Sequence, residues 1–378
     1  MTKFVACLMA FIMFFSTQTG AFARQDKKIN IKSEAAVMID TETGAVLYSK
    51  NPDEALYPAS LTKIATAIYA IEKGNLNDIV TVSRNAATTE GTRVYLNVGE
   101  KVQLKKLIQG MLINSGNDAA VAIAEHLGGT VEQFETELNE YLRTNIGVQH
   151  THFVTPNGLF NENHYTTAMD LALITKYALQ NPVFSEVFGL KELNWVGQSW
   201  KTTLVSKHRM LNGEVPFQYV TGGKTGFIDE SKQTLATSAD NGKLKLVVVA
   251  LKADHKKDIY KDTVKLFNYG FSSFGHETLP KDKTFKSGKN LYLVSQETMV
   301  TKPLNDQVEK VDKKSSMLNV ENKNGDILQQ IKLTEKKIPN EKHKEEYTEN
   351  MHLNLFYGII PVLAIFLFMF LKRKLIRS

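Results

Sequence analysis

The stretch Pro58-Ala59-Ser60-Leu61-Thr62-Lys63 opens the first strongly helical segment of the chain. An apolar stripe at helical spacing follows it, and Gly74 ends it. Ser60 and Lys63 are three residues apart, so they share one face at the start of this helix. A serine hydroxyl is a poor nucleophile until a base takes its proton, and a lysine can be that base when burial or nearby cations lower its pKa. Alone, the pattern S-x-x-K is weak, because it also fits a helix N-cap followed by a solvated lysine.

Strand patterns on both sides of this helical region predict an α+β domain. The runs 35–39 and 45–48 flank a Gly-containing turn and are typical of a hairpin. Far downstream, the runs 234–239 and 244–251 flank Asn241-Gly242, a strong signal for a two-residue turn. Helical stripes lie between the hairpins, and a further helix over 260–274 is expected to pack on the sheet that the strands form. We therefore expect one α+β domain over residues 24–275, which is large enough to hold a catalytic site.

The residue pattern changes after about residue 275, from helical stripes to short strand-like runs. Short β-prone runs separated by turn residues predict a small β domain over residues 276–334. Residues 335–352 are expected to be a solvated stalk, because nine of the 16 residues from 335 to 350 are charged and almost none is apolar.

The N-terminus has the pattern of a secretory signal peptide over residues 1–23. Lys3 precedes the apolar run Phe4 to Phe15, and Ala21-Phe22-Ala23 resembles a cleavage site. This apolar run is too short to cross a hydrocarbon core about 30 Å thick. Cys7, the one cysteine of the chain, lies within the segment, so the exported chain is expected to have neither disulfide nor thiol chemistry.

The C-terminus has the pattern of a single transmembrane helix. Residues 353–371 carry no charge, and the tail 372–378 that follows them is basic, as positive-inside topology predicts. A buried core helix is the alternative, which a terminal position beside a basic flank disfavours. We expect a single-pass protein of the cell membrane whose catalytic part lies outside the cytoplasm.

The net charge of +6 is explained by these two ends. Setting aside Lys3 and the four basic residues of the tail leaves 41 basic against 40 acidic residues, so the exported part is close to neutral. Composition therefore gives no reason to expect a nucleic acid as partner. The histidines show no paired metal spacing such as H-E-x-x-H, so neither a metal nor another cofactor is expected.

Two further motifs accompany Ser60 and Lys63. Asn114-Ser115-Gly116-Asn117-Asp118 separates a helix ending near residue 113 from one over 119–127, and we expect it on a short exposed turn. Val220-Thr221-Gly222-Gly223-Lys224-Thr225-Gly226-Phe227 is typical of a strand whose glycines allow another segment to approach its backbone. Each motif alone has an ordinary structural explanation.

The order and spacing of the three motifs make them specific in combination. S-x-x-K at 60, S-x-N at 115 and K-T-G at 224 are separated by 55 and 109 residues. With the longer stretches around them and Phe153-Val154-Thr155-Pro156-Asn157-Gly158-Leu159, the sequence resembles the low-molecular-mass penicillin-binding proteins, the serine-type D-alanyl-D-alanine carboxypeptidases of peptidase family S11. The resemblance covers about residues 30–275. It implies a β-lactamase/transpeptidase-like α+β fold, peptidoglycan stem peptides as substrate and β-lactams as covalent inhibitors.

The resemblance also implies roles for individual residues. Ser60 would be the acyl-ester nucleophile, Lys63 its general base and Ser115 a proton relay between Lys63 and the leaving amine. Asn117 would hold the substrate amide and Lys63, while Lys224 and Thr225 would bind the terminal carboxylate. The backbone N–H groups of Ser60 and of Phe227, which follows Gly226, would form the oxyanion hole. We assign no role to Lys207, His208 and Arg209.

Three other functions share these motifs. A D,D-endopeptidase that cuts crosslinks would use the same residues, and a non-catalytic penicillin-binding sensor would be acylated without turnover. A β-lactamase would need a deacylating glutamate, and Glu135-Thr136-Glu137-Leu138-Asn139 matches the class A pattern E-x-x-L-N. That match lies only 20 residues after Ser115, in a helix over 131–142 whose apolar stripe excludes Glu135. We therefore expect Glu135 on a solvated helix surface.

Overall fold

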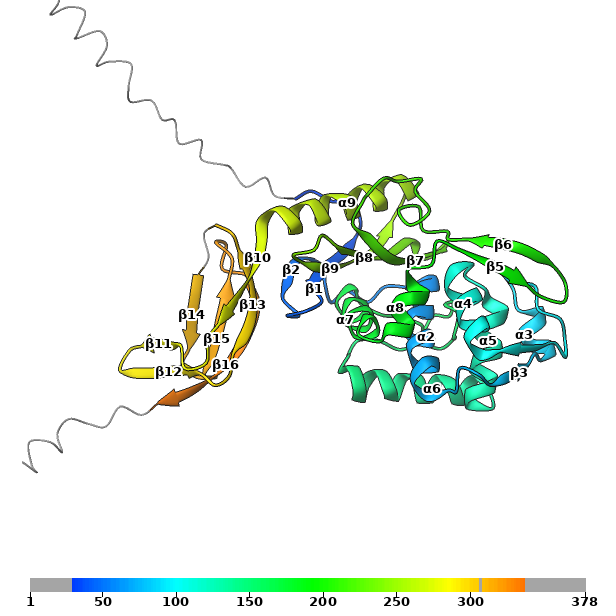
Figure 1. The fold of residues 1–378 in the computed structure, drawn as a ribbon, viewed down its shortest axis with the longest axis horizontal. Helices are drawn as coiled ribbons and strands as arrows, with labels where there is room; N and C mark the ends of the chain where they lie inside the picture. The colour runs from blue at the N-terminus through cyan, green and yellow to red at the C-terminus, as the bar shows by residue number, and fades with distance from the viewer. Residues whose placement is uncertain (1–28, 306–307, 337–378) are drawn as a thin grey trace, which may run out of the picture.

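The computed structural model describes residues 29–305 and 308–336 (Figure 1). The predicted signal peptide, membrane helix and basic tail lie outside these residues, as does most of the predicted stalk. Within the described ranges, every helix is too short or too polar to cross a membrane.

A five-stranded antiparallel sheet forms the centre of the larger part of the molecule, in the order β2-β1-β9-β8-β7. Its strands are β1 (Ala35–Asp40), β2 (Val46–Lys50), β7 (Val220–Ile228), β8 (Lys232–Asp240) and β9 (Lys245–Ala253). The pairing of β1 with β9 joins the two hairpins that the sequence predicts. The downstream turn is longer than predicted: Asp240 pairs with Lys245, which leaves the four residues 241–244 as the loop. Asn241 Oδ1 closes that loop by accepting the N–H groups of Lys243 and Leu244.

Both faces of this sheet are covered. Alternate residues of β1 contribute to two separate cores: Val37 and Ile39 face the helical side, whereas Met38 faces α9 (Lys256–Ser273). Burial on both faces explains why residues 35–39 of β1 are an unbroken apolar run rather than an alternating pattern. Figure 1 shows α9 along one side of the sheet and α7 (Ala168–Leu179), α8 (Pro182–Phe188) and α2 (Thr62–Lys73) on the other.

The helical side is completed by elements that lie between the two hairpins in sequence. These are the 3-10 turn Ala59–Leu61, α3 (Arg84–Thr88), α4 (Leu104–Ile113), α5 (Asn117–Gly128) and α6 (Val131–Tyr141), which a π-helical turn, Leu142–Ile146, extends. Two short ribbons accompany them: β3 (Ile79–Thr81) with β4 (Lys101–Gln103), and β5 (Glu192–Val196) with β6 (Lys201–Val205). The predicted α+β arrangement is confirmed, with α5 beginning two residues and α9 four residues before the predicted helices.

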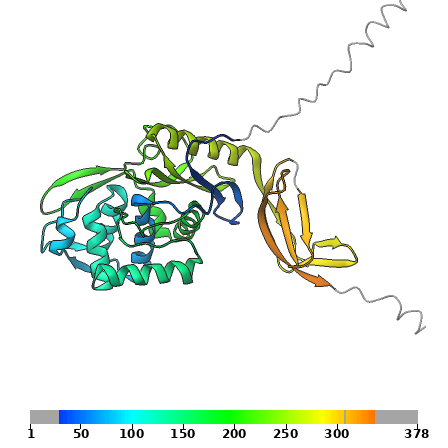
Figure 2. The same ribbon diagram turned by 180° about the vertical axis from the view of Figure 1, so that it is seen from behind.

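The C-terminal strands form a separate β region, which Figure 2 shows at the opposite end of the molecule from α3. A sheet in the order β11-β12-β16-β15-β14 and the pair β10-β13 enclose a core of their own, which includes Tyr292, Leu318 and Val320. The strands are β10 (Phe274–Leu279), β11 (Thr284–Ser287), β12 (Asn290–Val294), β13 (Thr298–Pro303), β14 (Val308–Asp312), β15 (Met317–Glu321) and β16 (Ile327–Lys336). Because β16 pairs with β12 up to Lys336, its last two residues are strand, where the sequence predicted the beginning of the stalk.

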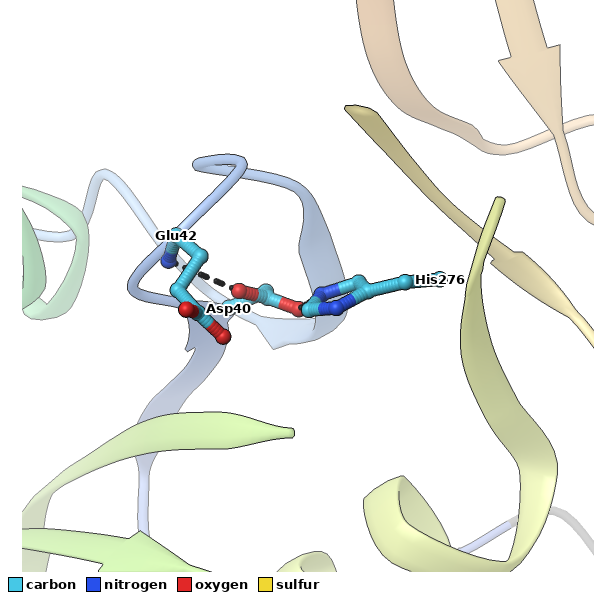
Figure 3. Close-up of side chains that lie close together, drawn as sticks. All are labelled: Asp40, Glu42 and His276. Atoms are coloured by element: carbon cyan, nitrogen blue, oxygen red, sulfur yellow. Dashed lines mark hydrogen bonds and ion pairs between the residues drawn. The ribbon is translucent and has the colours of Figure 1, made fainter. Parts of the chain in front are cut away.

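The buried carboxylate of Asp40, at the end of β1, holds the β region against the central sheet (Figure 3). Its Oδ2 accepts hydrogen bonds from His276 Nε2 at 2.6 Å and from Thr301 Oγ1 at 3.0 Å, on β10 and β13. Its Oδ1 accepts the N–H groups of Glu42 and Thr43 in the β1–β2 turn. One side chain thus shapes the turn and joins the two parts of the molecule.

Candidate active site

Ser60 lies in the 3-10 turn that precedes α2, and several backbone contacts fix this turn. Ala59 has φ +48°, a left-handed conformation that is rare for a residue with a side chain. Its carbonyl oxygen packs so closely on Gly158 that a Cβ there would lie 1.9 Å away. Thr234 Oγ1, on β8, donates a hydrogen bond of 2.9 Å to the Pro58 carbonyl. The strained turn is therefore held from two sides, as is common where a reactive group must be placed accurately.

Lys63 is fully buried one helical turn after Ser60. Its Nζ lies 2.9 Å from Ser60 Oγ, 2.8 Å from Asn117 Oδ1 and 2.5 Å from the Asn157 carbonyl oxygen. Burial and the positive charges of Lys224 and Lys207 lower the pKa of Lys63 well below its ordinary value, although Asp118 opposes the shift. A neutral amine at this position can accept the proton of Ser60.

The second motif lies at the start of α5 and is buried, so the prediction of an exposed turn was wrong. Ser115 is 7% exposed and Asn117 is 5% exposed, because the segment 90–98 and strand β7 cover them. Asn117 donates its backbone N–H to the Thr92 carbonyl and its Nδ2 to the Glu90 carbonyl, both at 2.7 Å. These bonds leave Asn117 Oδ1 facing Lys63.

Lys224, on β7, reaches the second motif from the opposite side. Its Nζ donates hydrogen bonds to Ser115 Oγ at 3.1 Å and to the Thr225 carbonyl at 2.8 Å. Burial, together with the charge of Lys207, lowers the pKa of Lys224 to about 7. In the described residues Ser115 Oγ bonds Lys224 rather than Lys63, so the relay from Lys63 through Ser115 stays a prediction.

Strand β7 runs directly beside the turn that carries Ser60. A Cβ on Gly226 would lie 2.3 Å from Thr234 Oγ1 and 3.0 Å from the backbone nitrogen of Ser60. Only a residue without a side chain permits this approach. The two backbone donors predicted for the oxyanion hole, those of Ser60 and Phe227, therefore belong to adjacent segments. The Thr225 hydroxyl has no hydrogen-bond partner within the described part of the chain, which leaves it available to a substrate.

The sequence analysis did not identify His164, which supports the turn of Ser60 through Thr62. His164 Nδ1 accepts the N–H of Val154, so its Nε2 carries the proton and donates to Thr62 Oγ1 at 2.8 Å. Thr62 in turn donates to the Ala59 carbonyl. Burial lowers the pKa of His164 to about 3, which keeps the ring neutral. The carbonyl of Asn157 was also missed as a partner of Lys63, although the stretch around it contributed to the family resemblance.

His208, for which no role was predicted from the sequence, packs against β7. A Cβ on Gly223 would lie 2.3 Å from its ring, and its Nε2 is 2.8 Å from Thr237 Oγ1. Burial and the nearby Lys224 lower the pKa of His208 to about 3. Its neighbour Lys207 is exposed, with Nζ 3.3 Å from Thr92 Oγ1. Arg209 forms an ion pair with Glu214.

Glu135 lies on α6 and is half-buried, rather than on a solvated surface as predicted. It lines a cavity of about 670 Å³ with His152 and Arg143, and neither Ser60 nor Lys63 lines that cavity. Burial and the charge of Glu132 raise the pKa of Glu135 to about 7. The E-x-x-L-N match is thus a partly buried glutamate outside the site of Ser60.

The described residues contain one group of histidine and carboxylate side chains close enough to hold a metal ion: Asp40, Glu42 and His276, at the junction shown in Figure 3. Both oxygens of Asp40 already accept hydrogen bonds there. The group lies outside the site of Ser60 and Lys63.

Residues 21–255 match the family Peptidase_S11, described as D-alanyl-D-alanine carboxypeptidase. The chain belongs to this family. Among peptidase S11 relatives, it is 32% identical over 311 residues to D-alanyl-D-alanine carboxypeptidase DacF of Bacillus subtilis, covering 78% of each chain. It is also 32% identical to D-alanyl-D-alanine carboxypeptidase DacC of Escherichia coli, over 73% of this chain and 70% of that protein.

Solved structures share the fold of this S11 chain. The D-alanyl-D-alanine carboxypeptidase DacD of Francisella tularensis superposes with a TM-score of 0.70 at 24% identity, covering 82% of this chain and 93% of that one. Penicillin-binding protein 5 of Haemophilus influenzae gives a TM-score of 0.69 at 24% identity, over 82% and 98%. The expected penicillin-binding-protein-like α+β fold is confirmed.

A pH profile tests the influence of Lys207 on Lys63 in this S11 site. A general base at Lys63 requires the neutral amine, and the charge of Lys207 favours that form. Replacing Lys207 with Met removes the charge and raises the pKa of Lys63, so the acidic limb of kcat/KM moves to higher pH. We expect Lys201→Met, on exposed β6, to leave the profile in place. An unmoved acidic limb in Lys207→Met would contradict the assignment of that limb to Lys63.

Proposed function

We propose that this chain is a serine D-alanyl-D-alanine carboxypeptidase that removes the terminal D-alanine from peptidoglycan pentapeptides through an acyl-enzyme on Ser60. The observation that carries the proposal is the contact of a buried lysine amine with a serine hydroxyl, 2.9 Å apart, in a chain of family S11.

The chemistry begins with transfer of the Ser60 proton to Lys63 Nζ as Ser60 Oγ attacks the carbonyl between the two D-alanines. The oxygen of that carbonyl becomes negative and is stabilised by the N–H groups of Ser60 and Phe227. The C–N bond then breaks. The leaving amine takes the proton held on Lys63 Nζ, with the Ser115 hydroxyl as the relay. Water hydrolyses the ester in a second step, which returns Ser60 to its hydroxyl form.

Recognition of the free carboxylate follows from the charges around Ser60 and Lys63. The positive charges of Lys224 and Lys207 act on this site, and the opposing carboxylate of Asp118 is occupied by the backbone N–H groups of Val94 and Leu96. The site is therefore positive where the substrate ends. Lys224 and Thr225 would bind the terminal carboxylate, which favours substrates with a free C-terminal D-alanine.

The assay that tests this function compares two substrates. The full-length protein in detergent is incubated with a pentapeptide and with a crosslinked peptide dimer, and the products are weighed by mass spectrometry. Loss of one alanine from the pentapeptide is expected. Cleavage of the dimer alone would show a D,D-endopeptidase instead, and acylation by penicillin without release from either substrate would show a sensor.

A second prediction concerns β-lactams. We expect penicillin to acylate Ser60 and to leave it slowly, because Glu135 lines a different cavity and cannot activate a deacylating water there. Glu135→Gln should therefore leave the lifetime of the acyl-enzyme unchanged, as followed with fluorescent penicillin. Rapid penicillin hydrolysis that the Glu135→Gln variant loses would instead support a β-lactamase.

We also propose that the protein is exported by residues 1–23 and held in the cell membrane by residues 353–371, with the catalytic part outside. The composition of these segments supports the proposal. A chain that ends at residue 350 is expected in the soluble fraction outside the cell membrane, whereas the full chain remains with the membrane. Membrane retention of the truncated chain would contradict the anchor.

A further inference from the structure

A second cavity, of about 560 Å³, lies beside the predicted active site and has no part in the chemistry described above. It is bounded by the segment 87–98 and by the tip of the β5–β6 hairpin, which extends along the end of the molecule that carries α3 (Figure 1). Its lining combines aromatic rings with small polar side chains: Thr88, Arg93, Tyr95, Asn97, Ser199 and Trp200.

Tyr95 is held outward at a conformational cost. The residue is 51% exposed and its backbone has φ +59°, which is rare for a bulky residue. The Asp118 carboxylate imposes this conformation, because it accepts the N–H groups of Val94 and Leu96 on either side of Tyr95. A strained aromatic residue fixed in an exposed position points to a binding function.

Trp200 completes an aromatic corner with Tyr95. The two rings meet edge to face with centroids 5.2 Å apart, and Trp200 Nε1 donates to the Val94 carbonyl at 2.7 Å, which fixes its orientation. Arg93 lies over the Tyr95 ring at 5.4 Å. It is the one charged side chain among the described residues that line the cavity, so the cavity suits an uncharged ligand with both apolar faces and hydrogen-bonding groups.

The cavity is within reach of a substrate bound at Ser60. Thr92 contacts the site directly, since its carbonyl accepts the N–H of Asn117 at 2.7 Å. Tyr95 is three residues further on, so their Cα atoms are at most about 11 Å apart. An extended pentapeptide spans roughly 17 Å. A group attached to the first residue of a stem peptide can therefore reach Tyr95 while the last residue lies at Ser60.

We propose that this cavity binds the sugar to which the stem peptide is attached, an uncharged N-acetylated ring of the peptidoglycan strand. The apolar face of such a ring stacks on Tyr95 or Trp200, while its hydroxyl and amide groups bond the polar side chains Thr88, Asn97 and Ser199. This inference rests on the proposed carboxypeptidase function and adds a second point of recognition to it.

The test compares a free pentapeptide with the same pentapeptide linked to its disaccharide, using the full-length protein. We expect kcat/KM to be about tenfold higher for the linked substrate, through a lower KM. Tyr95→Ala should reduce this ratio to about one, and Tyr95→Phe should retain it because the flat ring remains. Tyr165→Ala, which truncates another exposed aromatic ring, is the matched control and should keep the ratio.

Several outcomes would overturn the inference. Equal kcat/KM values for the two substrates in the wild-type protein would refute the proposed sugar site. The proposed carboxypeptidase function would be unaffected by that result. A ratio that survives Tyr95→Ala, or one that Tyr165→Ala also lowers, would place recognition elsewhere. A ratio that falls as salt is raised would mean that Arg93 binds an acidic group instead. Release of D-alanine from neither substrate would overturn both proposals.

Discussion

Ser60→Ala is expected to lower kcat for D-alanine release by about 10⁶-fold, the order seen when a catalytic serine is removed from a hydrolase. The physical reason is that no other hydroxyl replaces it: Ser115 Oγ bonds Lys224 and, within the described residues, does not contact Lys63. The same variant should lose covalent labelling by fluorescent penicillin. D-alanine release and labelling measured on one preparation check both expectations.

A structural control is needed because the turn around Ser60 is strained. Ser60 is only half-buried, so the substitution removes one hydroxyl and leaves no cavity of consequence. The melting temperature of Ser60→Ala should therefore match that of the wild type within a few degrees. Ser272→Ala, at an exposed position on α9, should keep full labelling. Continued D-alanine release from Ser60→Ala would refute an acyl-enzyme on this residue.

Lys63→Met is the second large effect, with an expected loss of about 10³- to 10⁴-fold in kcat/KM. Met fills a similar volume without a base, so Ser60 retains its hydroxyl but no group takes its proton. The Asn117 Oδ1 and Asn157 carbonyl acceptors lose their donor, which costs about 1–3 kcal/mol for a buried unsatisfied group. Stopped-flow acylation by penicillin and D-alanine release should fall together.

Lys105→Met is the matched control for this variant. Lys105 lies on α4 with its side chain 39% exposed, and its ion pair with Glu186 is a surface contact. The control should retain both activities. If Lys63→Met acylated with penicillin as fast as the control, Lys63 would be excluded as the base for acylation.

The sequence alone was sufficient to predict the two hairpins of the central sheet and to identify the three motifs by their spacing. Strand β1 is recognisable because residues 35–39 are all apolar, and Ser60 and Lys63 share a face because helical geometry requires it. The pairing of β1 with β9, across about 200 residues of chain, followed from the expectation that strands at both ends of a domain form one sheet.

The burial of the second motif could not be predicted from its own residues. Ser115 and Asn117 are polar and lie where α4 ends and α5 begins, a pattern typical of an exposed turn. They are buried because the segment 90–98 and β7, distant in sequence, close over them. The same reason explains why Glu135 is half-buried, since its cavity is formed in part by residues 148–154.

His164 and His208 carried no signal either. Each is a single histidine outside any motif, and each acquires its role from a partner far away in sequence: Thr62 for His164 and Thr237 for His208. The four-residue loop at 241–244 has a local cause, since Asn241 closes it with its side-chain Oδ1, which accepts the N–H of Leu244, and with its backbone N–H, which donates to the Leu244 carbonyl. Turn signals locate a hairpin more reliably than they fix its loop length.

The contact between Asp40 and His276 has a mechanical consequence. The chain passes from α9 directly into β10, and the bonds of Asp40 to His276 and Thr301 add a second attachment, so the β region cannot swivel freely about a single linker. A force on the C-terminal end of β16 would therefore turn the β region and the central sheet together, so the site of Ser60 and Lys63 would keep its orientation relative to β16.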